Sequence, residues 1–375
     1  MVKVGINGFG RIGRLAFRIG VLKHSDELQF AAINTSGSME AAGWAHLVNY
    51  DTTYRKFAYE VESEETKALD KATDDDPLIG YLLVSERNVK AAVLVQKDPA
   101  KVPWSRFGAD VVIESTGKFT SEEDAKKHAV GGAKRVVISA PVKGGNVGTY
   151  IIGVNEAPSA GSGQAREAYI LSNSSCTTNS VAPVMAVLSS KFGVEKAAVT
   201  TIHAYTDEQN LQDGSHKDLR RARAAAANIV PTTTGAAIST TETIPELKGI
   251  FAGRALRVPV ICGSITDFAV VVKKNVTVEE INQSFVEAGQ NLIYKGILAT
   301  SNEPLVSSDI IGRSESAIVD LSLTQVVGGN MVKIFAWYDN EWGYANRLVE
   351  QVVRVGRTLE TNSTPTDPIT LSFKS

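Results

Sequence analysis

The segment Lys3-Val4-Gly5-Ile6-Asn7-Gly8-Phe9-Gly10-Arg11-Ile12-Gly13-Arg14 joins a short apolar run to three closely spaced glycines. The apolar run predicts a β-strand, and the spacing of Leu15, Ile19 and Leu22 predicts a helix directly after the glycines. Gly8, Gly10 and Gly13 therefore form the pattern G-x-G-x-x-G between a strand and a helix. The first glycine allows a tight turn, the second a close approach of a pyrophosphate, and the third close helix–strand packing. An ordinary glycine turn is the alternative, but the context favours dinucleotide binding.

Further strands and helices alternate through the first half of the chain. Apolar runs at 28–33, 93–95, 110–114 and 135–138 predict strands. Such alternation is typical of a mostly parallel sheet that binds ligands at the carboxyl ends of its strands. We therefore expect cofactor contacts from the small residues that follow these strands, which include Thr35, Ser36, Thr116, Gly117 and Ser139.

The end of the second predicted strand bears on the choice of cofactor. NAD-binding domains usually place an Asp or Glu here, which binds the adenosine ribose hydroxyls. This chain has Thr35 and Ser36 instead. An acidic side chain repels a 2′-phosphate, whereas hydroxyls can donate to it, so the sequence favours NADP. The alternative is that both hydroxyls only cap the turn.

Length and composition restrict the remaining possibilities. A chain of 375 residues with a net charge of −2 predicts two domains and no general attraction to nucleic acid or anionic membranes. Two cysteines cannot form a disulfide framework, no apolar run approaches a membrane span, and a strand begins at the N-terminus. We expect a soluble cytoplasmic α/β protein without a metal site. The acidic stretch 60–77 reads as a solvated surface insertion, and 361–375 as a loosely ordered polar tail.

The segment Ser172-Asn-Ser-Ser-Cys-Thr-Thr-Asn179 carries the strongest chemical signal. A strand is predicted at 168–171, and apolar residues from Val181 to Leu188 at helical spacing predict a helix that Pro183 starts or kinks. Cys176 would then lie at a helix N-terminus, whose partial positive charge lowers a thiol pKa from about 8.5. The same backbone N–H groups can hold an oxyanion. A buried structural cysteine is the alternative.

His203 is the histidine that best fits a catalytic partner. It follows a predicted strand at 197–202, in the same half of the chain as Cys176, although spacing alone does not bring the two together. The other four are expected on charged helical surfaces (His24, His128), in an early helix (His46) and in the basic cluster 215–223 (His216). That cluster could bind phosphate, contact another subunit or be a solvated face.

The second half of the chain predicts a largely antiparallel domain. Val258 to Ile261, 268–272 and 332–338 read as strands, Cys262 as a core residue, and a final helix runs to about Arg357. Hydroxyls at 232–234 and guanidinium groups at 254 and 257 suit phosphate oxygens.

Five motifs occur together in a recognisable order. They are Asn7-Gly-Phe-Gly-Arg-Ile-Gly-Arg14, Ser175-Cys-Thr-Thr-Asn179, His203-Ala-Tyr-Thr206, Arg220-Arg-Ala-Arg-Ala-Ala-Ala226 and Trp337-Tyr-Asp-Asn-Glu-Trp-Gly-Tyr344. In these motifs the sequence resembles the phosphorylating glyceraldehyde-3-phosphate dehydrogenases over nearly its whole length. The resemblance implies a Rossmann-type dinucleotide-binding domain at 1–175, to which a helix at 341–358 returns, and an α+β catalytic domain at 176–340.

The same resemblance implies roles for individual residues. Cys176 would attack the aldehyde and His203 would move the proton; hydride transfer would leave a thioester that inorganic phosphate cleaves. Substrate phosphate would contact Thr206 and Arg257, and attacking phosphate would contact Ser175, Thr177, Thr234 and Gly235. The cofactor, NADP or NAD, would contact Gly8, Gly10, Arg11, Ile12, Gly13, Thr35, Ser36, Lys97, Thr116, Gly117, Ser139, Ser215, Asn340 and Tyr344. A glycolytic homotetramer is implied, in which the loop 206–223 lines a neighbour's cofactor site.

Departures from the family pattern concern mainly the cofactor. Thr35 replaces an Asp, Gly214-Ser215 replaces a Leu-Pro common in NAD-preferring members, and Lys97 replaces an Arg. These favour NADP or dual use. Ser180 replaces a second cysteine without touching the nucleophile, and Asp207-Glu208 differs slightly from the usual substrate loop. Erythrose 4-phosphate or another phosphorylated aldehyde is an alternative substrate, and a non-catalytic scaffold is the alternative of a different class.

Overall fold

A computed structural model describes residues 1–142, 144–157 and 169–360. The expected polar tail at 361–375 and the start of the predicted strand at residue 168 lie outside these described residues. The described chain divides into two compact units. Unit 1 contains 1–150, 157–174 and the chain from 345 onward, and unit 2 contains 151–156 and 175–344. Among the described helices, none is both long and apolar enough to cross a membrane.

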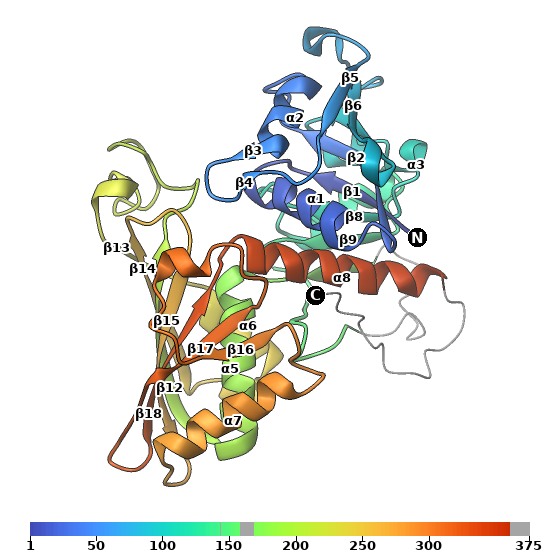
Figure 1. Cartoon of the computed structure of the whole chain (residues 1–375). Coiled ribbons are helices and arrows are strands. Elements are labelled where there is room, and N and C mark those ends of the chain that lie inside the picture. The colour runs from blue at the N-terminus through green and yellow to red at the C-terminus, as the bar shows by residue number, and fades with distance from the viewer. Residues whose placement is uncertain (143, 158–168, 361–375) are drawn as a thin grey trace. The chain divides into compact units, whose positions relative to one another are not determined.

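Unit 1 is built on a nine-stranded sheet (Figure 1). Its strand order is β10-β11-β9-β8-β1-β2-β7-β6-β5, and every pairing from β10 to β7 is parallel. The last two strands run antiparallel. The strands are β1 Val2–Asn7, β2 Leu28–Thr35, β5 Glu62–Glu65, β6 Leu78–Val84, β7 Val89–Val95, β8 Val111–Glu114, β9 Arg135–Ile138, β10 Gly148–Thr149 and β11 Tyr169–Ser172. The expected parallel sheet is therefore confirmed, with an antiparallel edge added.

Helices and a small hairpin complete unit 1. They are α1 Arg11–Lys23, α2 Ala41–Asn49, the hairpin β3 Tyr50–Asp51 with β4 Arg55–Lys56, α3 Trp104–Phe107, α4 Glu122–Val130 and α8 Trp342–Glu360, which begins in unit 2. Gly20 lets α1 approach β2, because a Cβ there would lie 2.5 Å from the Phe30 ring. Trp104 and Ala125 bring α3 and α4 onto a core that includes Ala32 and Val112.

The acidic stretch lies on the surface of unit 1, as expected. Its glutamates form the edge strand β5, which the sequence did not indicate, and most of them are exposed. Glu64 pairs with Lys90, and Asp76 pairs with Lys67, so part of the negative charge is neutralised locally. Charged edge strands also discourage pairing with another chain.

Unit 2 contains a seven-stranded sheet of order β13-β14-β12-β15-β18-β17-β16. The pairings β14–β12 and β17–β16 are parallel and the other four are antiparallel, so the sheet is largely antiparallel. The strands are β12 Val194–Ala204, β13 Val230–Thr232, β14 Phe251–Val258, β15 Ser264–Val272, β16 Leu298–Ser301, β17 Ala317–Val327 and β18 Met331–Tyr338. The strand expected to continue to Ile261 ends at Val258, because Pro259 has no N–H and Val260 N–H turns back to the Val258 carbonyl.

Three helices cover this sheet: α5 Cys176–Phe192, α6 Ala236–Thr243 and α7 Val278–Gln290. Figure 1 shows α5 and α7 on the same side of the strands. The apolar stripe of α5 is buried, including Val184 and Leu188, and it shares one core with Phe268 and Ile334. Pro183 lies inside α5 beyond its first turn and does not end the helix.

One boundary expected from the sequence was wrong. The predicted first domain includes residues 151–156, but they belong to unit 2. Ile151 and Ile152 are buried, Val154 packs against the unit 2 core, and Gly153 at φ +87° lies against Ile297. A six-residue segment of this kind has no periodicity that could reveal its partner.

Candidate active site and cofactor-binding turns

Cys176 is the first residue of α5. Ser175 caps the helix, because its hydroxyl accepts the Thr178 N–H at 3.1 Å. Ser174, just before the cap, is held at φ +53°, a left-handed conformation that non-glycine residues rarely adopt. The backbone N–H groups of Cys176 and Thr177 lie against the sulfur. The thiol therefore lies close to several hydrogen-bond donors, as the sequence predicted.

His203 lies directly opposite this thiol. It is the penultimate residue of β12, and its Nε2 is 3.3 Å from Cys176 Sγ. Its Nδ1 is 2.6 Å from the Ala204 carbonyl oxygen, which can only accept. Arg257 Nη1, which can only donate, contacts the same Nδ1 and also donates to the Ala204 carbonyl at 3.1 Å. With the Arg257 proton on that carbonyl, the ring protonated on Nδ1 presents the lone pair of Nε2 to the thiol. The two residues that the sequence singled out are thus brought together.

The other histidines are separate from this pair. His46 is exposed on α2, His24 bonds to Glu27, and His216 lies in the loop before β13. The expectation for His128 was wrong: it is fully buried, 3.0 Å from Glu114 Oε2 and 3.1 Å from Trp104 Nε1. Most of its neighbours on α4 are charged, so the sequence pattern did not show that His128 faces the core.

The protonation of the pair differs from the sequence prediction. Burial raises the pKa of Cys176, which outweighs the opposing effects of Arg257 and of the Thr177 hydroxyl and N–H. Burial also lowers the pKa of His203 to about 3, and the Arg257 guanidinium contributes in the same direction. The expected thiolate is therefore not favoured before substrate binds. A neutral thiol faces a neutral imidazole, which is the form that can accept the proton.

Arg257 joins the catalytic pair to a group of charges. It contacts His203 Nδ1, donates to the Ala204 carbonyl at 3.1 Å, and lies 3.3 Å from Glu208. Arg221 lies 2.8 Å from the same Glu208 oxygen. Buried Thr206 Oγ1 and Arg257 Nε have no hydrogen-bond partner among the described residues. Such open donors beside a cation fit a phosphate group.

The hydroxyl of Tyr338 links the residue after Cys176 to the sheet. Tyr338, the last residue of β18, lies 3.0 Å from Thr177 Oγ1 and 2.7 Å from Thr201 Oγ1. Its ring packs edge-on to His203, with centroids 5.9 Å apart, and burial raises the pKa of its phenol. Tyr338 was not among the residues that the sequence singled out. The alternating burial of β18 would have placed it inward, where a tyrosine hydroxyl needs partners.

The start of α6 carries Thr234 and Gly235, which the sequence predicted to contact phosphate. Thr234 Oγ1 accepts the Ala236 N–H at 3.1 Å, and Gly235 is exposed, so that a Cβ there would meet no atom within 4 Å. The first N–H groups of a helix attract anions. Both expected residues thus lie at an accessible helix N-terminus.

The glycine-rich turn of unit 1 has the geometry that a dinucleotide requires. Gly8 has φ +96°, and a Cβ on Gly13 would lie 2.2 Å from the Gly8 carbonyl. A Cβ on Gly10 would meet nothing within 4 Å, so the backbone there is open to a ligand. Gly10 is also the N-cap of α1, whose first residues are Arg11 and Ile12. These residues fit a pyrophosphate.

Comparisons with known proteins identify the family of the chain. A family model described as "Glyceraldehyde 3-phosphate dehydrogenase, NAD binding domain" matches residues 2–122, and one described as "Glyceraldehyde 3-phosphate dehydrogenase, C-terminal domain" matches residues 175–340. The chain belongs to the glyceraldehyde-3-phosphate dehydrogenase family. A glyceraldehyde-3-phosphate dehydrogenase of Streptomyces coelicolor is 47% identical over 96% of this chain and 99% of its own length. Similar proteins of Mycobacterium avium and Bacillus cereus are each 45% identical, over 96% and 93% of this chain and 99% and 97% of their own lengths.

Family membership fixes the class of enzyme and cofactor. Glyceraldehyde-3-phosphate dehydrogenases are phosphorylating oxidoreductases, and the N-terminal family model is that of an NAD binding domain. The chain is thus a dehydrogenase with a nicotinamide cofactor.

Within this dehydrogenase, the turns expected to hold the adenosine differ in what they can donate. Thr35 is buried, and its hydroxyl donates to the Leu94 carbonyl at 3.1 Å. Ser36 and Lys97 are exposed, and Lys97 has no hydrogen bond or ion pair within the described residues. Ser215, in unit 2, is also exposed. Thr116 bonds to Glu114, while Gly117 at φ +70° and Ser139 follow β8 and β9.

The structure of unit 2 orients Asn340. Its Oδ1 accepts from Gly263 N–H at 3.2 Å and from the Ser264 hydroxyl at 2.9 Å. Ser264 in turn accepts the N–H of Ala204, next to His203, at 3.1 Å. Because these two bonds occupy the amide oxygen, the side chain of Asn340 can contact a ligand through its amide N–H groups, which are donors. Tyr344 is buried in α8.

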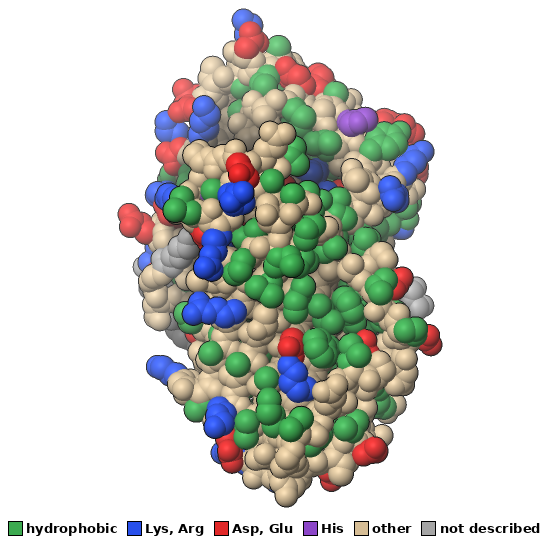
Figure 2. All heavy atoms as spheres, turned by 90° about the vertical axis from the view of Figure 1, so that its left-hand side faces the viewer, with side chains coloured by type: hydrophobic (Ala, Val, Ile, Leu, Met, Phe, Trp, Pro, Cys, Tyr) green, Lys and Arg blue, Asp and Glu red, His purple; other side chains and the backbone are tan. Residues whose placement is uncertain are grey.

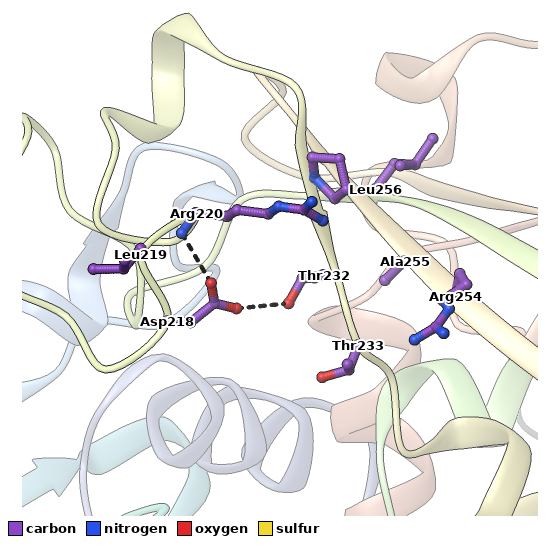
Figure 3. A pocket seen from close by; sticks show the side chains of 9 residues that line it. Asp218, Leu219, Arg220, Thr232, Thr233, Arg254, Ala255 and Leu256 are labelled. Carbon is purple, nitrogen blue, oxygen red and sulfur yellow. Dashed lines mark hydrogen bonds between the residues drawn. The ribbon is translucent and has the colours of Figure 1, made fainter.

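A pocket of about 710 Å³ lies at the β13–β14 edge of the dehydrogenase's second unit and does not include Cys176 or His203. Figure 3 shows Arg220 and Arg254 on opposite sides of it, with Thr233 beside Arg254. Asp218 accepts from Arg220 N–H and from the Thr232 hydroxyl. Part of the basic cluster thus lines a pocket at a sheet edge.

Proposed function

We propose that this enzyme oxidises and phosphorylates glyceraldehyde 3-phosphate to 1,3-bisphosphoglycerate in glycolysis. The observation that carries the proposal is the 3.3 Å contact between Cys176 Sγ and His203 Nε2, next to the open donors of Thr206 and Arg257. This arrangement supplies a nucleophile, a base and a place for a phosphorylated aldehyde. The 43–47% identity to named glyceraldehyde-3-phosphate dehydrogenases supports the choice of substrate.

In the oxidation of the aldehyde, His203 accepts and returns protons while Cys176 forms a bond to the substrate. As Sγ attacks the aldehyde carbon, the thiol proton passes to Nε2, and returns to the new oxyanion to give a thiohemiacetal. The N–H groups of Cys176 and Thr177 can stabilise that oxyanion. Nε2 then removes the hydroxyl proton while hydride leaves the same carbon, which produces a thioester on Cys176. The oxidised nicotinamide, when bound, supplies the acceptor for that hydride.

Inorganic phosphate completes the reaction. A phosphate oxygen attacks the thioester carbon, the carbon–sulfur bond breaks, and the acyl phosphate leaves. Ser175, Thr177, Thr234 and Gly235 are the residues proposed to hold this phosphate. The Ser175 hydroxyl and the N-terminus of α6 provide donors for it. The departing sulfur takes the proton that Nε2 of His203 removed from the thiohemiacetal hydroxyl, so the pair is neutral again and ready for another turnover.

We propose that NADP is used, either in preference to NAD or alongside it. Support now comes from exposed Ser36 and Lys97 in unit 1 and exposed Ser215 in unit 2, together with the lack of an acidic residue at 34–36. Thr35 contributes less than the sequence suggested, because its single proton is donated to Leu94. The exposed ammonium group of Lys97 remains the strongest potential partner for a 2′-phosphate.

Initial rates with glyceraldehyde 3-phosphate and inorganic phosphate test the reaction and the cofactor together. We expect turnover in the wild type and in Cys262→Ser, and none in Cys176→Ser. Faster turnover of erythrose 4-phosphate would contradict the substrate, and lack of turnover with either aldehyde would favour a scaffold. A kcat/KM at least about 10-fold higher with NADP, or about 1.4 kcal/mol, would support NADP preference. Clear NAD preference, unchanged by Lys97→Gln, would contradict it.

We also propose a cytoplasmic homotetramer. On the side of unit 2 that carries β13 and β14, Leu219 and Ile229 are exposed, which suits burial against another subunit. Figure 2, which faces this side, shows hydrophobic side chains gathered there. Cys176 and Cys262 are free thiols, as a reducing compartment permits. A fully active monomer in sedimentation, or recovery outside the cytoplasm on fractionation, would contradict these two proposals.

A further inference from the structure

Glu114, at the end of β8, is a buried carboxylate surrounded by donors. It is 1% exposed. Its Oε1 accepts the Thr116 N–H at 2.8 Å and the Thr116 hydroxyl, and its Oε2 accepts Asn7 Nδ2 at 2.5 Å. The fourth contact is His128 Nε2, 3.0 Å from Oε2. A carboxylate buried this deeply is tolerated only when its oxygens are satisfied.

Trp104 determines how His128 takes part. An indole N–H can only donate, and Trp104 Nε1 lies 3.1 Å from His128 Nδ1. Nδ1 must therefore carry a lone pair, so the proton of the neutral ring is on Nε2 and is donated to Glu114. All four groups in contact with Glu114 donate a hydrogen bond to it, and all four are uncharged.

These four contacts connect two cofactor-binding turns. Asn7 and Glu114 are register partners on the parallel strands β1 and β8, so their side chains share one face of the sheet. Asn7 directly precedes the glycine-rich turn, and Thr116 belongs to the turn after β8. Ser115 Oγ adds a bond to the Gly8 carbonyl at 2.8 Å. The turns pack so tightly that a Cβ on Gly8 would lie 2.7 Å from Thr116 N.

A second layer of bonds extends the network to β2. The Asn7 Oδ1 accepts Asn34 Nδ2 at 2.7 Å, and the Asn34 carbonyl accepts the Gly8 N–H at 3.0 Å. Asn34 Oδ1 accepts the Gln96 N–H at 2.9 Å. Gln96 directly follows β7, so the ends of four neighbouring strands (β8, β1, β2 and β7) are linked through buried side chains.

We propose that Glu114 is a positioning residue for the nicotinamide cofactor: its carboxylate fixes the glycine-rich turn and the Thr116–Gly117 turn relative to each other. The His128–Trp104 pair orients that carboxylate from α4 and α3. The inference rests on the cofactor-binding role of unit 1, and does not depend on which aldehyde is oxidised.

The test is Glu114→Gln, with Glu123→Gln as the matched control. A glutamine replaces one acceptor oxygen by an NH₂ group, which can only donate. Whichever way the amide is turned, this NH₂ group faces the donors of Thr116 or those of Asn7 and His128, and the hydrogen bonds there are lost. Glu123 is an exposed glutamate on α4 whose replacement removes the same charge. Direct binding of NAD and NADP to each purified full-length protein is measured by calorimetry, together with kcat at saturating cofactor.

We expect the Kd of Glu114→Gln to rise at least 10-fold, about 1.4 kcal/mol, while kcat at saturation changes less than threefold. Glu123→Gln should match the wild type in both. An unchanged Kd in folded Glu114→Gln, or a loss confined to kcat, would overturn the proposal. Wild type that binds neither cofactor would instead contradict the dinucleotide site itself.

A second pair of variants covers the case in which Glu114→Gln does not fold. Thr116→Ser keeps the hydroxyl that donates to Glu114, whereas Thr116→Val removes it at similar volume. We expect the valine variant to bind cofactor at least threefold more weakly than the serine variant. Equal affinity of the two variants would overturn the proposal.

Discussion

Two of the five histidines are buried, and their surroundings give them opposite properties. In unit 2, His203 has the Ala204 carbonyl and the Arg257 guanidinium at Nδ1 and a thiol at Nε2. In unit 1, His128 has an indole N–H at Nδ1 and a carboxylate at Nε2. His203 thus presents a lone pair to a reactive group, whereas His128 presents its proton to a group that only accepts. The partners, more than burial itself, decide which imidazole can act as a base.

The two imidazole rings also differ in whether they can exchange a proton with a reacting molecule. Every polar atom of His128 has a fixed protein partner, so no site remains for a reacting molecule. Nε2 of His203 faces a thiol that leaves it during reaction, and Arg257 beside it opposes a positive charge on the ring. A buried histidine therefore suggests catalysis only when one of its nitrogens faces a group that can change its bonding.

The largest expected effect is on turnover when His203 is changed. His203→Asn should lower kcat/KM for the aldehyde by roughly 10²- to 10⁴-fold, because general-base catalysis contributes that much. The measurement is steady-state kinetics at saturating cofactor and phosphate. His46→Asn, an exposed histidine on α2, is the control and should match the wild type. A loss below 10-fold for His203→Asn would assign the proton transfer to another group.

Sequence reasoning predicted where the candidate nucleophile and the glycine-rich turn lie better than it predicted which residues pack around them. The strand–glycine–helix pattern at 3–22 and the Cys176 helix start were predicted, because local periodicity and capping determine both. The same reasoning placed His128 on the surface, since the neighbouring charges of α4 dominate a pattern in which only Ala125 and His128 face inward. It missed Tyr338 and Glu114 because their roles depend on partners far away in the chain.

The pKa of Cys176 shows a second limit of local reasoning. A helix N-terminus lowers a thiol pKa in isolation, and the sequence shows that helix plainly. Burial by the sheet opposes it, and burial depends on β12 and β18, which come from distant parts of the chain. Likewise, the segment 151–156 joins unit 2 through contacts with Ile297 that no short-range pattern encodes.

The next largest effect is on stability when His128 is changed. His128→Leu leaves the Trp104 N–H without an acceptor and removes one of the two donors to Glu114 Oε2, which keeps its bond from Asn7. An unsatisfied buried group costs about 1–3 kcal/mol. His128→Gln keeps one donor and one acceptor on a side chain of similar reach. Urea unfolding should show His128→Leu to be less stable than His128→Gln by about 1–3 kcal/mol. Equal stabilities would mean that packing alone determines the site.

The smallest effect, measured per pH unit, is the pH dependence of stability due to His203. Its folded pKa of about 3 lies below the ordinary value of 6.5, so the unfolded chain binds this proton more readily between those limits. Stability from His203 is therefore complete above pH 6.5 and falls as the pH drops, by at most about 1.4 kcal/mol per unit. His203→Asn cannot bind the proton, while all other titrating groups are shared with the wild type. The difference in unfolding free energy between the two proteins should thus change with pH between 6.5 and 4 and stay constant above 7.5. A difference that stays flat throughout would mean that His203 keeps its ordinary pKa in the folded protein, so that burial does not hold the imidazole neutral below pH 6.5.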